Sequence, residues 1–468
     1  MITGMKHLRQ AALAAALLIG LGKTAHADGI DDYLKAQMAA RHIPALSVAV
    51  VQDGRVVKTA AYGVSDINAK TSATPNTRFI LGSCTKPFTA VAVLQLMEAG
   101  KVNLDAPIAR YLDGLPAAWH AITVRELLTH TSGLPNYRLF VNYAKLSDPK
   151  YNRSGSVVAL LADKPPDFAP GTKYEYSNSN YHLLAQLVEK VSGRTYGDFL
   201  AAYQFKAAGM TATRLATLPA LLPSQAVGYN WDGKRRRSNT IFLPRALDYG
   251  DDGLVSTAGD VAKWATALST GQLVSEATLK QMITPGTPTD GSASSYGLGL
   301  IVVPYKGQTL ATHSGATPGY SSTLAYFVDS RLSVVVLCNL FNEADLSMTE
   351  PLALGVAKQY LPAAPAPDAI PDTEPQVAAL LRKVSAQLAA RKLDRSLFTP
   401  AFQAALTPAA VNPAQDLLAP LGPLSSLTLL RRDADGTAAY RAVYGTTVVD
   451  WLIAVDKDHK ITLLRPQP

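Results

Sequence analysis

Apolar and polar residues alternate along two early segments and four late ones, and this period of two predicts strands. The early pair, Leu46–Gln52 and Arg55–Ala61, flanks Asp53-Gly54, which is a hairpin signal. The late runs are Leu298–Val303, Thr309–His313, Ser322–Val328 and Leu332–Cys338. Because short turns join most of the late runs, we expect them to pair antiparallel.

The segments between these strands follow a helical period instead. Helices are predicted over Ile30–Arg41, Phe88–Ala99, Val124–Thr129 and Tyr181–Val191. Gly100 and Gly193 mark the ends of two of them, and Thr123 with Glu126 forms a capping-box pattern at the start of a third. Early and late strands with helices between them predict an α+β fold, in which helices flank one antiparallel sheet and a helical lobe stands beside it.

The composition changes after Gln359. Leu361–Pro367 is rich in Pro and Ala, which is typical of a fairly stiff linker. Beyond it, a helical pattern over Val377–Arg391 precedes four alternating runs: Ser425–Leu430, Ala438–Tyr444, Thr447–Val455 and Ile461–Leu464. We therefore expect a main domain over residues 28–361, a linker over 362–374 and a small accessory α+β domain over 375–468, in which no catalytic set is visible.

The N-terminus has the pattern of a cleavable signal peptide. Lys6 and Arg9 precede the apolar run Ala11–Leu21, and Ala25-His26-Ala27 supplies the small-x-small cleavage pattern. The apolar run is too short for a membrane span, which needs about 20 residues, and no other candidate span follows. We expect removal of residues 1–27 and an exported protein, periplasmic or secreted, without integral membrane association.

Composition and charge alter this picture little. With 468 residues, of which 48% are hydrophobic and 17% charged, the chain is long enough for one large core and a smaller domain. The formal charge of +8 falls to +5 without the three basic residues of the signal peptide. The cluster Lys234–Arg237 follows Asp232-Gly233 and is interpreted as a solvated hairpin tip, so nucleic acid is not expected as a partner. Cys84 and Cys338 are expected to be free thiols in the interior.

Gly82-Ser83-Cys84-Thr85-Lys86 stands directly before an apolar helical run and suggests a chemistry. Ser83 and Lys86 are three residues apart, so at a helix start their Oγ and Nζ atoms come within hydrogen-bond reach. An amine held against a hydroxyl can take its proton if burial or a neighbouring charge keeps the amine partly neutral. A second Ser-x-x-Lys, Ser147–Lys150, lies in a polar stretch with Pro and is interpreted as loop.

Two later elements offer partners for this pair. Tyr176-Ser177-Asn178 is the one Tyr-x-Asn in a chain with 20 Tyr residues. Adjacent cations would lower the pKa of such a phenol from about 10, and Asn178 can hold a substrate amide and the lysine together. In His313-Ser314-Gly315, the imidazole could donate towards the site and the Gly would let a substrate backbone lie close. A buried Tyr capped by Asn and a strand-end surface His remain open alternatives.

With these three elements in order, the chain resembles the penicillin-recognising serine hydrolases. That superfamily includes class C β-lactamases, D-Ala-D-Ala carboxypeptidases, D-aminopeptidases and β-lactamase-like esterases, and its S-x-x-K, S-D-N and K-T-G elements follow the same scheme. The resemblance runs from Leu46 to Asn339. It includes four further stretches: Phe79–Gly82, Leu127–Leu134, Gly253–Thr257 and Tyr296–Gly299.

The resemblance implies a role for each element. Ser83 would be the acylated nucleophile and Lys86 its proton acceptor, while Tyr176 would pass the proton to the leaving group and later activate water. Asn178, His313 and Gly315 would bind substrate, and the first two would bias the tyrosine towards its anion. The backbone N–H groups of Ser83 and Ala316 would form the oxyanion hole, and no cofactor is required. His in place of the third-element Lys is associated, by the same resemblance, more with peptidases and esterases than with efficient β-lactamases.

Other chemistries lack their motifs. The chain has no Gly-x-Ser-x-Gly elbow, His-Glu-x-x-His or paired Cys-x-x-Cys, and its eight His residues are scattered. His130, in the turn after a short helix, is interpreted as structural. We therefore expect an exported serine hydrolase that forms an acyl-enzyme on Ser83 with a small-molecule or peptide substrate: a D-amino-acid peptide, a short ester or a β-lactam. The alternative is a penicillin-binding sensor or binding module that acylates without turnover, and the oligomeric state stays open.

Overall fold

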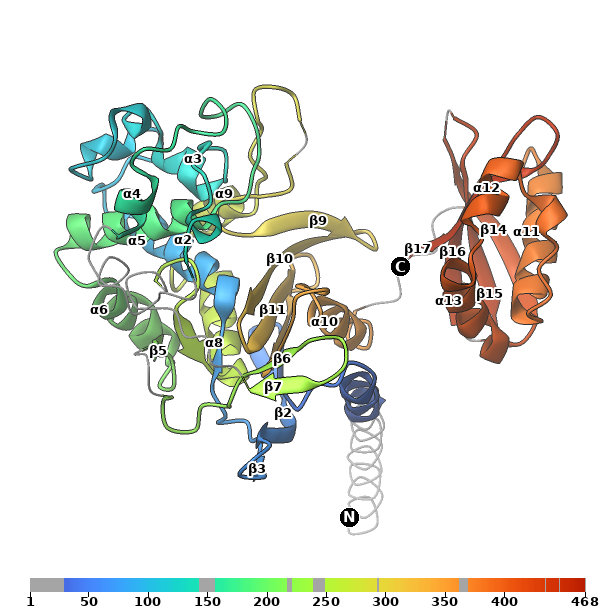
Figure 1. Cartoon of the computed structure of the whole chain (residues 1–468), viewed down its shortest axis with the longest axis horizontal. Coiled ribbons are helices and arrows are strands. Elements are labelled where there is room, and N and C mark those ends of the chain that lie inside the picture. Colours follow the sequence, from blue (N-terminus) through green and yellow to red (C-terminus); the bar gives the residue numbers. More distant parts are fainter. Residues whose placement is uncertain are drawn as a thin grey trace, which may run out of the picture. The chain divides into compact units, whose positions relative to one another are not determined.

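A computed structural model of the chain describes residues 29–142, 156–216, 221–238, 249–292, 294–361, 369–433, 435–445 and 447–467. The chain divides into two compact units at the bond between Pro362 and Ala363, and each unit is described by itself (Figure 1). Three predicted features lie outside the described residues: the signal peptide over 1–27, the second Ser-x-x-Lys at 147–150, and residues 362–368 of the linker.

The first unit is built on a seven-stranded sheet with the order β3-β2-β1-β12-β11-β10-β9. Its strands are β1 (Ala45–Gln52), β2 (Arg55–Asp66), β3 (Thr71–Ser72), β9 (Ile301–Tyr305), β10 (Gln308–Thr317), β11 (Tyr320–Phe327) and β12 (Leu332–Cys338). Neighbouring strands pair antiparallel, and the early hairpin joins the late strands where Val48 faces Val336. The predicted antiparallel sheet is confirmed.

Three predicted strand boundaries are wrong. β2 runs on to Asp66 rather than ending at Ala61. β9 begins at Ile301 rather than Leu298, because Gly299 adopts a φ of 92° where a Cβ would lie 2.6 Å from the Ala90 side chain. β10 continues past His313 to Thr317, since its pairing with β11 runs on to the turn at Tyr320. The third sequence element therefore lies inside a strand and not at its end.

Both faces of the sheet are buried, which explains the nearly continuous apolar sequence of β1 and β12. Alternate residues of β12 belong to different cores: Val335 and Leu337 to one, Val334 and Val336 to the other. On the first face lies α8 (Ala258–Ser269), which contacts β1 and β12. The other face is covered by helical residues 29–40 and by α10 (Glu350–Ala357).

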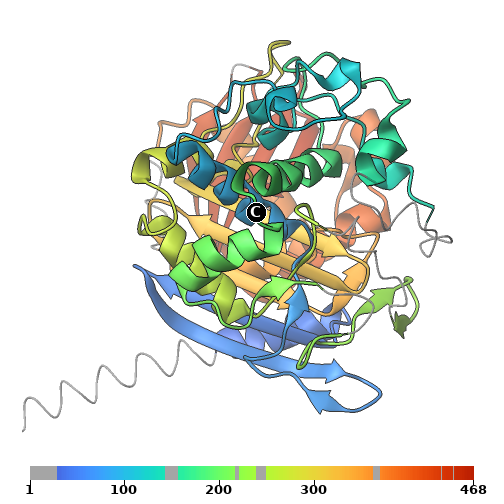
Figure 2. The ribbon, with the colours of Figure 1, turned by 90° about the vertical axis from the view of Figure 1, so that its left-hand side faces the viewer.

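The helical lobe lies next to the first face of the sheet (Figure 2). It contains α2 (Lys86–Glu98), α3 (Val124–Leu128), α4 (Ser156–Leu161), α5 (Asn178–Ser192), α6 (Tyr196–Leu200), α7 (Lys206–Ala208) and α9 (Glu276–Met282). Every residue of α2 from Lys86 to Leu94 is buried, so this helix is enclosed on all sides. The predicted capping box forms, with Glu126 N 3.2 Å from Thr123 Oγ1 and Thr123 N 2.7 Å from Glu126 Oε2.

Two small sheets complete the first unit, and of these the sequence analysis predicted only the hairpin at Asp232-Gly233. One has the order β4-β8-β5, with β4 (Phe79–Ile80), β5 (Arg214–Leu215) and β8 (Leu254–Ser256). The other consists of β13 (Leu340–Asn342), β6 (Tyr229–Trp231) and β7 (Arg236–Ser238). The turn between β6 and β7 is exposed from Asp232 to Arg237, which confirms a solvated tip. Cys84 and Cys338 are buried free thiols, as expected.

The second unit is the predicted small α+β domain. Its antiparallel sheet is β14 (Leu424–Arg432), β15 (Ala438–Tyr444), β16 (Thr447–Val455) and β17 (Ile461–Gln467), and α11 (Pro375–Ala389) packs on β14 and β16. Two shorter helices, α12 (Pro400–Ala405) and α13 (Pro408–Leu418), were not predicted. Within the described ranges, no helix combines the length and the apolar character that crossing a membrane requires.

Asn339 joins three parts of the first unit and gives a test of its packing. Its buried amide accepts from Ala45 N at 2.7 Å and donates to Val227 O at 2.9 Å. Asn339→Ala should lower the free energy of unfolding by about 2–4 kcal/mol, because both backbone groups lose their partner. Asn103→Ala is the control in thermal unfolding, since Asn103 accepts one exposed bond, from Asp105 N at 2.9 Å. Equal losses in the two variants would contradict this account.

Candidate active site

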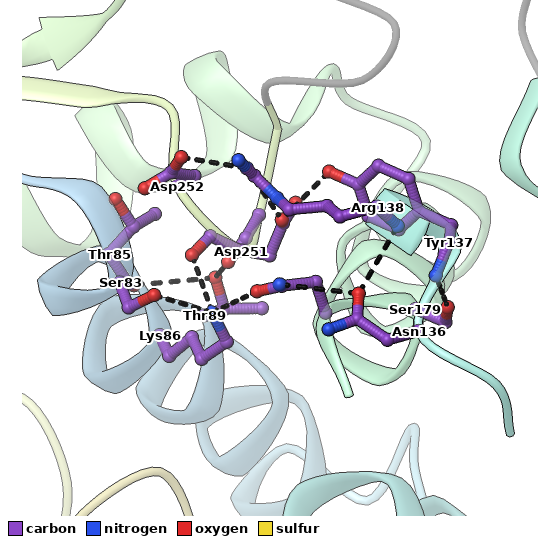
Figure 3. A network of polar contacts seen from close by, with 12 residues as sticks. Ser83, Thr85, Lys86, Thr89, Asn136, Tyr137, Arg138, Ser179, Asp251 and Asp252 are labelled. Carbon is purple, nitrogen blue, oxygen red and sulfur yellow. Dashed lines mark hydrogen bonds and ion pairs between the residues drawn. The ribbon is translucent and has the colours of Figure 1, made fainter. Parts of the chain in front are cut away.

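The predicted nucleophile lies in a short 3₁₀ turn, η1 (Gly82–Thr85), that leads directly into α2. Lys86 begins α2 with Pro87 in the first turn, where the missing N–H of proline costs no helical bond. This geometry turns the two side chains towards one another, and Lys86 Nζ lies 3.1 Å from Ser83 Oγ (Figure 3). The hydrogen bond expected from the spacing of Ser83 and Lys86 is confirmed.

Lys86 is fully buried, and three acceptors surround its Nζ atom. Besides Ser83 Oγ they are Asn178 Oδ1 at 2.7 Å and the backbone oxygen of Asp251 at 2.8 Å. An ammonium has three donors, so this set matches its hydrogen-bonding capacity. Burial lowers the pKa of Lys86 to about 8, against the opposing effect of Asp251 and Asp252. The amine form is therefore accessible near neutral pH.

Tyr176 joins the same cluster. Its ring centroid lies 4.9 Å from Lys86 Nζ, and its hydroxyl interacts with the side chain of Ser83. Burial raises the pKa of Tyr176 well above its ordinary value, and the hydrogen bond from Ser83 lowers it by less. The expected bias of this tyrosine towards its anion is therefore wrong. Tyr176 holds its proton at neutral pH, which leaves Lys86 as the group able to accept the proton of Ser83.

Asn178 is the first residue of α5, so the start of that helix fixes its side chain beside Lys86. Its Oδ1 accepts from Lys86, and its Nδ2 donates to Asn136 Oδ1 at 3.4 Å. Asn136 in turn caps the short helix η4 (Tyr137–Leu139) by accepting from Arg138 N. The expected contact with the lysine is present, and the amide group of Asn178 lies close to a second asparagine that the sequence analysis did not single out.

His313 lies close to the cluster but interacts differently from what was expected. Its ring centroid is 6.2 Å from that of Tyr176, and both ring nitrogens already have partners. Nδ1 donates to the carbonyl of Ser314 at 2.6 Å, so Nε2 accepts from the hydroxyl of Tyr296 at 2.9 Å. Burial is the main cause that lowers the pKa of His313 to about 3. The imidazole is therefore neutral and does not donate towards Ser83.

Gly315 is needed for a reason other than the predicted one. A Cβ at this position would lie 2.1 Å from Leu81 O and 2.5 Å from Ser322 Oγ. The absent side chain thus lets β10 approach the nucleophile turn itself. Close approach also brings Ala316 N to 3.1 Å from where a Cβ on Gly82 would lie, next to Ser83. The backbone N–H of Ala316, one of the two groups predicted for the oxyanion hole, therefore lies beside the nucleophile turn.

A buried ionic cluster beneath the nucleophile turn was missed. Asp251 and Asp252 precede β8 and are almost completely buried. Arg138 Nη2 lies 3.2 Å from Asp251 Oδ2 and 2.7 Å from Asp252 Oδ2, and Tyr137 donates to Asp251 Oδ2 at 2.9 Å (Figure 3). Asp251-Asp252 directly before the family-like stretch Gly253–Thr257 is the signal that could have revealed it. Among the described residues, no group of His, Cys, Asp and Glu side chains is arranged to hold a metal ion.

His130 has the structural role that was predicted. It is fully buried, and its Nδ1 accepts from Ser177 N at 3.2 Å. Its ring packs on the ring of Tyr176 with 4.3 Å between centroids. Burial lowers the pKa of His130 well below its ordinary value, so it stays neutral. It supports the loop that carries Tyr176 and does not reach Ser83.

Comparison with known proteins agrees with this geometry. Residues 30–358 match the family described as Beta-lactamase. The chain belongs to the beta-lactamase family. It is 30% identical to Penicillin-binding protein 4* of Bacillus subtilis over 311 residues, which cover 63% of this chain and 67% of that protein.

Relatives of this beta-lactamase family member include amide hydrolases. The chain is 32% identical over 309 residues to a D-aminopeptidase of Brucella canis, with 64% of this chain and 57% of that protein covered. The structure of a D-amino acid amidase from Ochrobactrum anthropi is similar, with a TM-score of 0.62 and 25% identity over 72% of this chain and 99% of that one. Family and neighbours together indicate a serine hydrolase.

The pKa of Lys86 gives a test by pH. The amine form increases as the pH rises through about 8, so kcat/KM for a neutral substrate should climb through pH 8 and level off about one pH unit above it. Lys86→Arg should lose about 10³-fold or more of this rate at every pH, because a guanidinium keeps its proton. A rate that falls between pH 7 and 9, or an active arginine variant, would contradict the assignment of Lys86 as the base.

Proposed function

We propose that this protein is an exported serine hydrolase that cleaves amides through an acyl-enzyme on Ser83. The observation that carries the proposal is the contact of Ser83 Oγ with a buried, partly neutral Lys86, with Tyr176 beside both. The oxygen of Ser83 would attack the substrate carbonyl while its proton moves to Lys86. The N–H groups of Ser83 and Ala316 would stabilise the oxyanion, a contribution of about 3 kcal/mol each.

The leaving group needs a proton, and Tyr176 is placed to give one. Because its phenol stays protonated, Tyr176 would donate to the departing nitrogen or oxygen as the carbonyl carbon to leaving-group bond breaks. It would regain a proton from Lys86, which lies 4.9 Å from its ring centroid. Water would then attack the acyl-enzyme. Its proton would go to Lys86, which is again a free amine, and would pass to Ser83 Oγ as the ester bond breaks.

For the substrate, we favour amides of D-amino acids over β-lactams and peptides with a free terminal carboxylate. In the third element His313 is neutral, where the resembled scheme has a lysine. The two cations described beside Ser83, Lys86 and Arg138, already contact the backbone or carboxylates of Asp251 and Asp252. Among the described residues, a substrate carboxylate would thus meet no further cation beside Ser83. The D-aminopeptidase and D-amino acid amidase relatives support the same choice.

A sensor that acylates once is the second candidate, because two relatives are penicillin-binding proteins of Bacillus subtilis. The presence of both Lys86 and Tyr176 favours turnover, since water activation still has its base. Export rests on the leader pattern of residues 1–27 and is tested by N-terminal sequencing of protein recovered from the periplasm or medium. A mature protein that begins at Asp28 is the expected result, and an intact leader in the cytoplasm would contradict it.

Ser83→Ala should cut turnover by roughly 10³-fold or more while leaving the fold intact. The substrates to compare are D-amino-acid amides, D-Ala-D-Ala peptides, p-nitrophenyl esters and nitrocefin, and D-amino-acid amides should be cleaved fastest. Ser177→Ala is a matched control, since the buried Ser177 Oγ has no hydrogen-bond partner within the described ranges and lies in the same loop as Tyr176. Unchanged turnover in Ser83→Ala would contradict the proposal. If the unmodified protein releases one equivalent of product and then no more, the sensor is favoured.

A further inference from the structure

The two carboxylates beneath the nucleophile turn are held there by strand pairing. β8 pairs with β4, and Leu81 N donates to Leu254 O at 2.8 Å, which brings Asp252 under Gly82. A Cβ on Gly82 would lie 3.0 Å from Asp252 Oδ1. The backbone oxygen of Asp251 accepts from Lys86 Nζ. The acidic pair is thus in the wall behind Ser83 and Lys86.

The cluster carries an imbalance of charge. Two carboxylates face one guanidinium, that of Arg138, so the cluster has one more acidic group than basic groups. Burial raises the pKa of Asp252, and the positive charges of Arg138 and Lys86 oppose this rise. Water does not screen this charge, since the Asp251 and Asp252 side chains are 0% and 2% exposed and Asp251 Oδ1 has no hydrogen-bond partner among the residues that the structure describes. The ammonium form of Lys86 restores neutrality. Charges at this depth interact far more strongly than at the surface.

In the part of the chain that the structure describes, the other titratable groups that face Lys86 are uncharged and cannot supply this balance. Two tyrosine rings lie near its Nζ, Tyr176 at 4.9 Å and Tyr181 at 5.8 Å, and burial raises the pKa of both. His130 and His313 are neutral because burial lowers the pKa of each. Burial also raises the pKa of the Cys84 thiol to about 12. The acidic pair and Arg138 therefore determine the field at the lysine.

We propose that Asp252 is a positioning residue that acts through Lys86: its carboxylate, held by Arg138 beneath the nucleophile turn, stabilises the ammonium and so sets how much free amine is present at a given pH. Asp251 contributes in the same sense and also fixes the amine through its backbone oxygen. Arg138 acts in the opposite sense, since its positive charge offsets part of the pair. Lys86 is thereby a stronger base, but a smaller fraction of it is in the free amine form at low pH.

The experiment follows the rate at which a fluorophosphonate labels Ser83 between pH 5.5 and 10, and it rests on the proposed acylation of Ser83. Asp252→Asn keeps the size of the side chain and leaves Arg138 paired with Asp251. In this variant the midpoint of the curve of labelling rate against pH should move about one unit to lower pH. The ratio of the rate at pH 6 to the variant's own plateau should therefore rise about tenfold.

Two further variants test the direction in which the charge of the cluster moves this midpoint. Arg138→Gln should move the midpoint to higher pH, while Arg138→Lys keeps the charge and should leave it near that of the unmodified protein. Asp260→Asn is the matched control: Asp260 is equally buried and pairs with Lys263 at 2.9 Å, but it does not act on Lys86. Its midpoint should not move. If thermal unfolding shows that Asp252→Asn is not folded, the two Arg138 variants decide the outcome.

The outcomes separate this inference from the proposed function. No labelling of Ser83 at any pH would overturn the proposed function itself. Labelling whose midpoint is the same in the unmodified protein, Asp252→Asn and Arg138→Gln would overturn only the role of the cluster. A shift of equal size and direction in Asp260→Asn would also overturn that role, because it would show a general response to a lost buried charge.

Discussion

One buried cation organises the site, because the Lys86 side chain has no access to solvent and must find its partners inside the protein. Its three acceptors come from separate segments: the turn η1, the start of α5 and the loop before β8. Each segment is held by different parts of the core, so the fold is what brings an alcohol, an amide and a backbone carbonyl to one point. Burying an amine without hydrogen-bond partners costs free energy, so the conformation that brings all three acceptors to Lys86 is favoured over the alternatives.

A second constraint is the close approach of β10 to the nucleophile turn. The Cys84 thiol lies 3.0 Å from His313 O of β10, and Ser322 Oγ of the neighbouring β11 donates to Leu81 O at 2.5 Å. Both strands and the turn therefore form one packed unit. Gly315 is the position that permits this contact. Backbone packing brings Ala316, one of the two groups proposed for the oxyanion hole, to the nucleophile turn, which side-chain chemistry alone would not reveal.

Much of the fold was predictable, because β1, β2, β11 and β12 have alternating or β-branched sequences with clear turns, and α3 and α5 carry explicit capping signals. Strands of two or three residues such as β4 and β8 have no periodicity to detect. Ser83, Lys86, Tyr176 and Asn178 were found through their motifs. The acidic cluster was not, since buried charges contradict the usual preference for the surface and Arg138 is 113 positions from Asp251. The state of His313 depends on Tyr296, a partner that no motif identifies.

The central claim is that Ser83 is the acylated nucleophile, and mapping a trapped adduct by mass spectrometry tests it most directly. After reaction with a fluorophosphonate, trypsin should release the segment from Phe79 to Lys101 as one peptide, because Pro87 blocks cleavage after Lys86. The account predicts one equivalent of label, placed on Ser83 by fragmentation of this peptide. A stoichiometric adduct on any other residue would contradict it.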